Sequence, residues 1–212
     1  MEWEARFAAV FEGEQSGSDA AHDEGHVRRV VANARKLAEA EGADLAVVLP
    51  AAWLHDCVVI PKNSSQRSSA SRLAAERAAA LLRAAGYSDQ HIPAIEHAIE
   101  AHSFSARVTP QTLEAKVVQD ADRLEALGAV GIARTFITGG ANGAPFYDLA
   151  EPFPVTRAAD DCTSIIDHFF TKLLKLAETM QTAAGRAAAQ QRAQFLKLYL
   201  TQLGSEIGVP FR

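Results

Sequence analysis

The sequence predicts an all-α protein, and three features of its 212 residues support this. Apolar residues recur at steps of three and four along almost the whole chain, which is the spacing of helices that bury one face. Runs that alternate or are rich in β-branched residues, as strands are, are nearly absent. Hydrophobic residues make up 48% of the chain and aromatic residues only 7%, so we expect a globular core built mainly of aliphatic side chains and alanine.

The expected helices follow one another along the chain. The first covers about 24–41, with Asp23 as its cap and Gly42 at its end. The second covers about 45–59, is apolar on all sides, and ends before Pro61, because a residue that precedes proline avoids the helical conformation. An alanine-rich helix then follows a polar, serine-rich stretch and stops at Gly86. Further helices are expected over about 88–101, 109–136 with a break, 162–182 and 183–207.

The length fits one domain over residues 1–212. We expect a core at about 20–137, a loop at 138–161, and C-terminal helices at 162–207. The loop contains Gly139, Gly140 and Gly143, with Pro145 and further prolines beyond, so no regular helix is expected in it. A loop of this length is usually functional, and we expect it to be mobile and to lie beside the pocket. A plain surface connection and a dimer contact are the alternatives.

The charge and composition exclude several classes of protein. A formal net charge of −5 and an isoelectric point near 5.8 argue against a partner that is a nucleic-acid polymer or an anionic membrane. No apolar stretch approaches the roughly 20 residues of a membrane span, and the first residues lack the pattern of a secretory signal. Two cysteines are too few for a disulfide scaffold, so both are expected to be reduced and the protein cytoplasmic.

The most informative local feature is the pair His55–Asp56 at the end of a strongly apolar stretch. Buried ionisable groups are costly unless something compensates them, and a cation is one such partner. A neutral histidine hydrogen-bonded in the core beside a capped aspartate is the alternative. His26 and Asp120 lie on apolar faces of two other expected helices, and imidazole and carboxylate donors together suit a divalent metal ion. Mn, Co, Ni, Mg, Fe and Zn are not distinguished by these residues.

Several motifs together resemble the HD-domain metal-dependent phosphohydrolase superfamily, in particular its small stand-alone bacterial branch. They are Asp19-x-x-His22-Asp23-x-x-His26, Ala52-Trp53-Leu54-His55-Asp56, Glu100-Ala101-His102-Ser103-Phe104-Ser105 and Gln119-Asp120-Ala121-Asp122-Arg123-Leu124. The similarity extends nearly through the whole chain. It implies an all-α helical bundle in which His26, His55, Asp56 and Asp120 hold one metal ion, and an activity that hydrolyses phosphate esters or anhydrides. His22 is kept as an alternative ligand.

Other residues are candidates for contacts with the substrate. His102 ends its helix inside the family-like segment, where it could contact phosphate or protonate a leaving group. Lys62 and Arg67 lie in the serine-rich loop directly after the His55–Asp56 helix, and Arg123 lies beside Asp122. Lysine and arginine neutralise phosphate, arginine through a bidentate fork. Several relatives carry a glutamate soon after the HD pair that this chain lacks, so the base is Asp56, a group elsewhere, or the metal alone.

The function expected from these residues is cytoplasmic phosphohydrolysis of a small phosphorylated substrate, a nucleotide in particular. The resemblance points to cleavage of a (deoxy)nucleoside triphosphate to the monophosphate and pyrophosphate. Nucleoside 5′-monophosphatase and cyclic-nucleotide phosphodiesterase activities are alternatives, as are a di-iron oxygenase and a non-catalytic ligand-binding protein. The sequence also leaves open whether the protein forms a homodimer.

Overall fold

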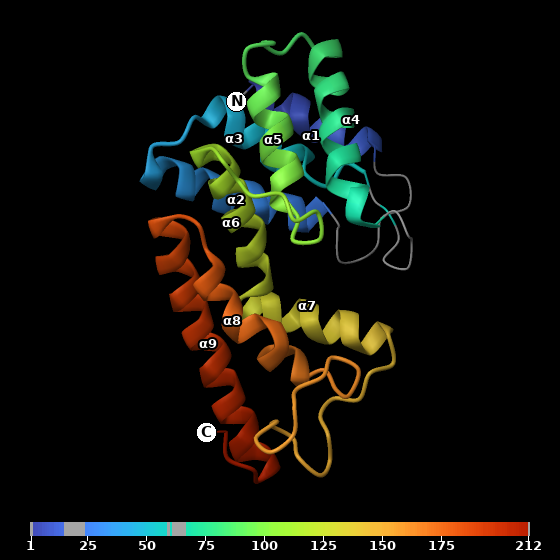
Figure 1. Ribbon diagram of the computed structural model, residues 1–212, viewed down its shortest axis with the longest axis vertical. Coiled ribbons are helices and arrows are strands. Elements are labelled where there is room, and N and C mark those ends of the chain that lie inside the picture. Colours follow the sequence, from blue (N-terminus) through green and yellow to red (C-terminus); the bar gives the residue numbers. More distant parts are fainter. Residues whose placement is uncertain (1, 15–23, 59, 61–66, 212) are drawn as a thin grey trace. The chain divides into compact units, whose positions relative to one another are not determined.

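A computed structural model describes residues 2–14, 24–58, 60 and 67–211 of the chain (Figure 1). Every regular element in these ranges is helical, so the all-α prediction is confirmed. The chain divides into two compact units, residues 1–122 and 123–212, whereas the sequence predicted one domain with a core that extends to about residue 137. The single-domain description stays a prediction. No helix in the described ranges has the length and apolar character that a membrane span requires.

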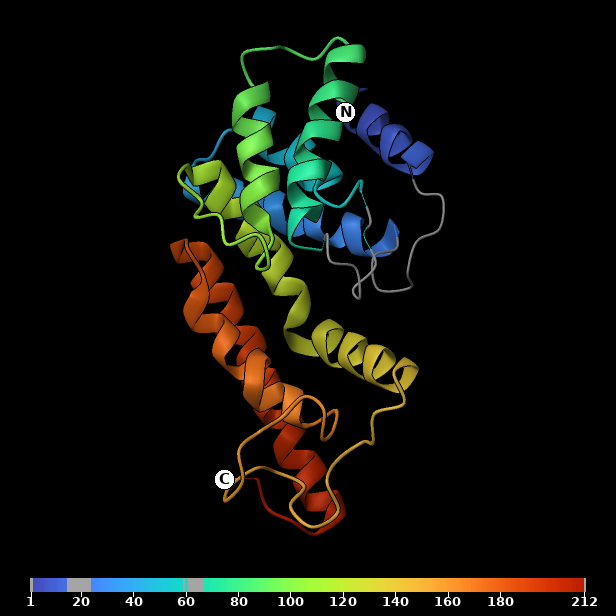
Figure 2. The same cartoon turned by 45° about the vertical axis from the view of Figure 1, so that its right-hand side comes forward.

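The first unit is a bundle of helices that pack on a central apolar one, α3. Its helices are α1 (Glu2–Glu14), α2 (Glu24–Glu41), α3 (Leu45–Leu54), α4 (Ala70–Ala84), α5 (Ile92–His102) and α6 (Leu113–Arg123), with a short 3₁₀ turn η1 (Arg67–Ser69) before α4. Helix α3 packs against α1, α2 and α5, and α5 also packs along α4 (Figure 2). The sequence did not predict α1. It placed the start of α5 too early, because Pro93, which favours the first turn of a helix, marks the true beginning.

Helix α2 shows how the amphipathic pattern positions chemistry. Val27, Val30 and Ala34 are buried on one face, as the spacing predicts. His26 begins this buried face in the first turn of the helix. Packing of α2 against α3 therefore carries the imidazole into the interior of the unit.

Helix α3 is buried along most of its length although it contains a proline. Pro50 has no backbone N–H, so the carbonyl of Ala46 loses its usual partner four residues ahead. The hydroxyl of Tyr87 donates to this carbonyl over 2.6 Å, which replaces the missing hydrogen bond. Helix α3 ends at Leu54, with His55 as its C-cap residue, and not near residue 59 as the sequence predicted. His55 and Asp56 therefore lie at a helix end.

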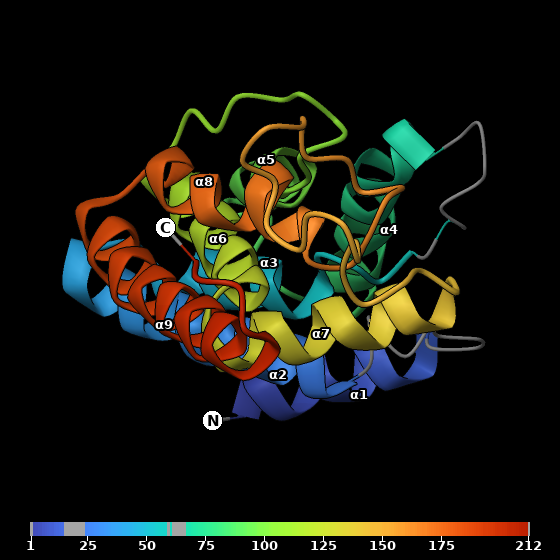
Figure 3. The ribbon, with the colours of Figure 1, turned by 90° about the horizontal axis from the view of Figure 1, so that it is seen from below.

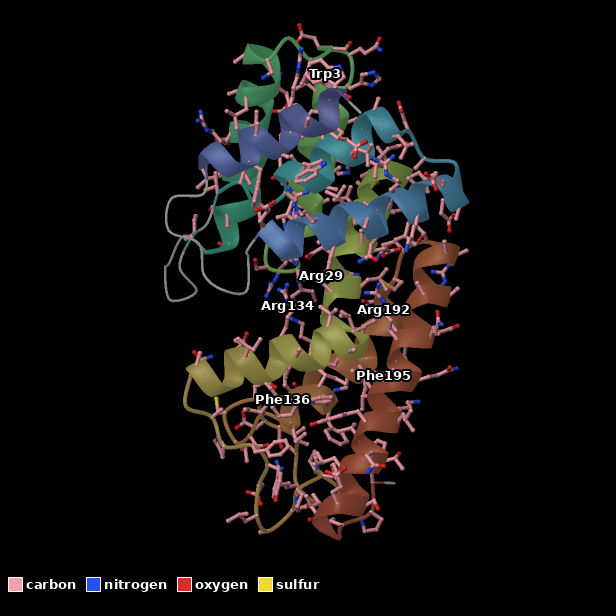
Figure 4. All side chains as sticks on the ribbon, turned by 180° about the vertical axis from the view of Figure 1, so that it is seen from behind. Trp3, Arg29, Arg134, Phe136, Arg192 and Phe195 are labelled. Atoms are coloured by element: carbon pink, nitrogen blue, oxygen red, sulfur yellow. The ribbon has the colours of Figure 1, made fainter. Side chains whose placement is uncertain are left out.

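The second unit is built around two helices, α7 (Gly128–Ala141) and α9 (Ala183–Ile207), which pack on each other (Figure 3). Between them the chain forms a π-helical turn η3 (Phe169–Leu173), a short α8 (Leu174–Leu176) and a 3₁₀ turn η4 (Ala177–Thr179), while η2 (Leu124–Ala126) precedes α7. Phe136 of α7 packs near Phe169 and Tyr199, with ring centroids 6.3 and 6.1 Å away, and Arg192 of α9 donates to the carbonyl of Leu124 over 2.6 Å (Figure 4).

The expectation that Gly139 and Gly140 lie in an irregular loop is wrong, because both belong to α7. A glycine inside a helix costs only about 1 kcal/mol relative to alanine, and packing can offset this. At Gly139 a Cβ atom would stand 2.5 Å from Cγ1 of Ile165, so this glycine allows the segment around Ile165 to approach α7. The loop begins after Ala141.

A buried ion pair ties this loop to the helical segment that follows it. Asp167 is fully buried, and the guanidinium of Arg157 donates to both of its carboxylate oxygens, at 2.7 Å for Nη2. The Ser164 hydroxyl and the Asp160 backbone N–H donate to the same carboxylate over 2.9 and 2.8 Å. Burial acts to raise the pKa of Asp167, but these donors lower it below its usual value. The mobility that the sequence predicts for this loop stays a prediction.

Candidate metal centre

The candidate centre lies in the first unit, where the ends of several helices meet. His26 comes from the first turn of α2, and His55 and Asp56 come from the end of α3. His102 is the last residue of α5, and Asp122 lies in the last turn of α6. Helix ends bring side chains together without requiring that a helix be polar along its length.

Three of the predicted ligands form a compact group. Ligand atoms of His26, His55 and Asp56 all lie within 4.8 Å of one another. Oδ2 of Asp56 lies 3.4 Å from Nε2 of His55 and 3.8 Å from Nε2 of His26. These separations match donors around one ion, since metal–ligand distances of about 2.0–2.2 Å place neighbouring donors roughly 3 to 4 Å apart.

The tautomers of two histidines follow from their backbone partners. Nδ1 of His55 lies 2.8 Å from the carbonyl of Ala52, and Nδ1 of His102 lies 2.6 Å from the carbonyl of Ile99. A carbonyl only accepts, so each Nδ1 carries a hydrogen and each Nε2 faces the carboxylates. Backbone carbonyls orient metal-bound histidines in this way. Nε2 of His55 is buried and lacks a hydrogen-bond partner, which is the orphaned atom that a metal ion would satisfy.

The fourth predicted ligand, Asp120, is not part of the compact group. It is fully buried in α6, where it has interactions of its own. Asp122 reaches the histidines instead, with Oδ1 at 3.5 Å from Nε2 of His26 and 3.9 Å from Nε2 of His55. Residues two apart on a helix point in nearly opposite directions, so a helix that presents Asp122 to the centre turns Asp120 away from it.

Burial differs between the two kinds of donor. The His55 and His26 side chains are 0% and 2% exposed, whereas those of Asp56 and Asp122 are 24% and 30% exposed. The histidines therefore form the closed side of the centre. The carboxylates are the part of the centre that is exposed to solvent.

The electrostatics of the group are those of a site that attracts positive charge. Burial acts to lower the pKa of His55, but Asp56 and then Asp122 outweigh it and raise the pKa from 6.5 to about 9. Burial acts to raise the pKa of Asp56, but His55 and His102 hold it well below its ordinary value. The pKa of Asp122 is lowered for the same reason, with His55 and His26 as its partners. Perturbed pKa values of this kind mark candidate functional sites.

The structure places the other candidate residues as follows. His102 joins the centre, with Nε2 3.6 Å from Oδ1 of Asp56 and its ring centroid 4.9 Å from that of His55. Arg123 donates to the carbonyl and the hydroxyl of Thr179, over 2.6 and 3.2 Å, so this part of its guanidinium is engaged within the second unit. Lys62 and the Arg67 side chain lie outside the described residues.

Sequence reasoning treated Asp122 only as an accessory group. The sequence shows two aspartates two residues apart in α6, and one of them must face away from the centre. Sequence spacing alone does not separate them, because each has a buried valine three or four residues before it, Val117 for Asp120 and Val118 for Asp122.

Comparisons with known proteins agree with this description. A family model described as HD domain matches residues 24–127. The chain is 35% identical over 203 residues to the protein YpgQ of Bacillus subtilis (strain 168), which covers 94% of this chain and 89% of YpgQ. A crystal structure of Bacillus subtilis YpgQ in complex with ADP superposes with a TM-score of 0.72 at 31% identity, over 97% of this chain and 95% of that one.

A second solved structure gives the same result. It is an HD-superfamily hydrolase from Bacillus thuringiensis, with a TM-score of 0.75 and 31% identity over 97% of this chain and 96% of that chain. The family match contains the histidines, the His55–Asp56 pair and both aspartates of α6. The chain therefore belongs to the HD-domain superfamily.

Proposed function

We propose that the protein is a metal-dependent phosphohydrolase whose substrate is a nucleotide, with cleavage of a (deoxy)nucleoside triphosphate to the monophosphate and pyrophosphate as the leading reaction. The observation that carries the proposal is a set of imidazole and carboxylate donors that is closed by buried histidines and open on the side of its acids. Family membership and the ADP complex of YpgQ support the substrate class.

In this proposal, one set of residues binds the metal ion and another orients the histidines. His26, His55, Asp56 and Asp122 would hold one divalent ion, with Asp122 in the place for which the sequence predicted Asp120. Such an ion supplies Lewis-acid polarisation of a phosphoryl oxygen and of the attacking water. The carbonyls of Ala52 and Ile99 orient the His55 and His102 rings so that each Nε2 faces the carboxylates.

Two residues are proposed to act on the substrate. Oδ1 of Asp56 faces His102, away from the oxygen that faces His26 and His55, and it can accept a proton from the attacking water. Nε2 of His102 lies on the same side and, when protonated, can donate a hydrogen bond to a phosphoryl oxygen or to the leaving group. Lys62, Arg67 and Arg123 stay predicted phosphate contacts.

The activity is tested with a panel of nucleotides and small phosphate esters, each incubated with Mn, Co, Ni, Mg, Fe or Zn. Orthophosphate and pyrophosphate are quantified separately, because pyrophosphate identifies cleavage of the α–β anhydride. Release of orthophosphate from monophosphates alone, or opening of cyclic nucleotides, would replace the proposed reaction by one of its alternatives. No hydrolysis with any metal would refute the phosphohydrolase proposal.

The choice between the two aspartates is tested with a matched pair of variants. Asp122→Asn should lose about one metal ion per chain in elemental analysis, as Asp56→Ala should, while Asp120→Asn should retain the ion. Circular dichroism checks that both variants are folded. If Asp120→Asn loses the ion and Asp122→Asn keeps it, the assignment predicted from the sequence is correct.

One observation favours a second candidate, a two-iron centre for oxygen chemistry. Asp56 presents its two oxygens to different histidines, Oδ2 to His55 and Oδ1 to His102, so His55, Asp56 and His102 would supply donors for more than one ion. Two irons per chain and oxygen consumption would identify this centre. One ion per chain and hydrolysis without redox change would identify the first candidate.

A further inference from the structure

The turn that follows α5 is attached directly to the candidate centre. Helix α5 ends at His102, whose Nε2 lies 3.6 Å from Oδ1 of Asp56, and residues 104–107 then form a turn (Figure 1). The hydroxyls of Ser103 and Ser105 lie 2.9 Å apart, within hydrogen-bonding distance, on either side of Phe104. The first residues of this turn are therefore held in a defined conformation.

Phe104 is 81% exposed. An isolated exposed apolar residue is ordinary by itself, and its position gives this one meaning. Consecutive Cα atoms are about 3.8 Å apart, so the Cα atom of Phe104 lies within about 7.6 Å of that of His102. Phe104 is thus an exposed aromatic residue two positions along the chain from His102, which is the proposed contact of a phosphoryl oxygen.

The end of the same turn has an unusual backbone. Arg107 has a φ of 56°, and it is the only residue other than glycine with positive φ in the described ranges. Glycine adopts this conformation without strain, whereas an arginine there is strained. Strain of this kind persists where the surroundings hold it, and it is found preferentially at ligand-binding segments. The exposed Arg107 side chain adds a cation to the turn that carries Phe104.

We propose that residues 103–107 form a nucleobase-binding arm in which the ring of Phe104 stacks on the base of the nucleotide while the phosphates lie at the metal centre. The inference rests on the proposed function, since it assumes a substrate that has both phosphates and a base. Every base has a π face, so stacking on Phe104 accepts several bases and favours nucleotides over phosphate compounds that lack a ring. The arm would thus determine the class of substrate and leave the choice of base open.

The test compares ADP, which carries a base, with inorganic pyrophosphate, which carries none. ADP and inorganic pyrophosphate are titrated against the wild-type protein, Phe104→Ala and Phe104→Trp in the presence of Mn²⁺. Loss of an aromatic ring that stacks on a base weakens binding by about five- to a hundredfold, so Phe104→Ala should bind ADP about tenfold or more weakly and pyrophosphate unchanged. Phe104→Trp should retain the affinity for ADP. Phe195→Ala, which removes an exposed ring of α9, should change neither affinity (Figure 4).

Each outcome decides the inference, and hydrolysis of nucleoside triphosphates by the wild-type protein is scored separately. The proposed base-binding role of Phe104 is refuted if Phe104→Ala leaves the affinity for ADP unchanged, or if it lowers the affinities for ADP and pyrophosphate equally. This holds even where the wild-type protein hydrolyses nucleotides. If the selective loss for ADP is found but no nucleotide is hydrolysed, the arm stands and the proposed activity fails. A wild-type protein that binds pyrophosphate but not ADP refutes the arm.

Discussion

Binding of a metal ion at the candidate centre should release one proton, and that proton comes from His55. Burial acts to lower the pKa of His55, but the carboxylates of Asp56 and Asp122 raise it to about 9, so the metal-free protein carries a protonated His55 at neutral pH. An imidazole binds a metal only in its neutral form. Asp56 and Asp122 have lowered pKa values and are already ionised, so they release no proton in this range.

The magnitude follows from the pKa. At pH 7, a group with a pKa of about 9 is neutral in about 1% of molecules, so metal should bind about a hundredfold more weakly than it does above pH 9. The affinity should rise about tenfold per pH unit between pH 6.5 and 8.5. The stability of the metal-free protein, in contrast, should fall as the pH rises. Because the folded pKa of His55 lies above the unfolded value of 6.5, its contribution of about 3 kcal/mol is fully present below pH 6.5 and is lost as the pH rises through about 9.

Isothermal titration calorimetry with Mn²⁺ measures the metal affinity and the number of protons released. The proton number follows from the binding enthalpies in buffers of different ionisation enthalpy. The control His91→Gln changes a histidine outside the centre, whose Nδ1 lies 3.8 Å from Oδ2 of Asp44, and it should leave the slope unchanged. An affinity that varies less than twofold over this range, or a release close to zero protons, would show that His55 is neutral before metal binds.

Three further predictions concern folding, each measured as the free energy of unfolding from chemical denaturation. Arg157→Met should destabilise the protein by about 3 kcal/mol, because it leaves the buried carboxylate of Asp167 without its cation; an effect below 1 kcal/mol would show that the other donors suffice. Tyr87→Phe should cost about 1–2 kcal/mol, because the carbonyl that Pro50 leaves without a donor loses its hydroxyl partner, and a neutral effect would contradict this account of α3. Gly139→Ala should cost about 1–3 kcal/mol because its Cβ atom would overlap Ile165, whereas an increase in stability would follow if helix propensity dominated.

The fold was largely predictable because most helices depend on local patterns. In α2, the stripe of valines and alanines predicts the extent of the helix, and in α4 the run of alanines does the same. The errors fall where tertiary contacts override local preference. Gly139 continues α7 because Ile165 fills the space beside it, and α3 stops at Leu54 although apolar residues continue. Neither Ile165 nor the partners of the residues after Leu54 can be identified from neighbouring sequence.

The candidate site shows the same division. His26, His55 and Asp56 were predictable because polar residues on apolar helix faces are rare and therefore informative. Asp120 and Asp122 satisfy that criterion equally, and only the rotation of α6 separates them, which depends on packing against the rest of the first unit. The role of His102 was likewise open in the sequence, because its distance to Asp56 depends on where α5 ends relative to α3.

The position of the donors at helix ends explains how one small unit holds both a stable core and an exposed reactive group. A donor in the middle of a buried helix would face apolar side chains and exclude substrate, whereas His55 and Asp56 follow the last turn of α3 and Asp122 lies in the last turn of α6. The helices keep their apolar contacts, and the carboxylates stay partly accessible at 24% and 30%. The same ends leave connecting segments next to the centre, and loops carried on a rigid scaffold are where binding residues concentrate. The turn with Phe104 is one such segment, so the proposed base-binding arm can vary in sequence without displacing the helix ends that carry the donors.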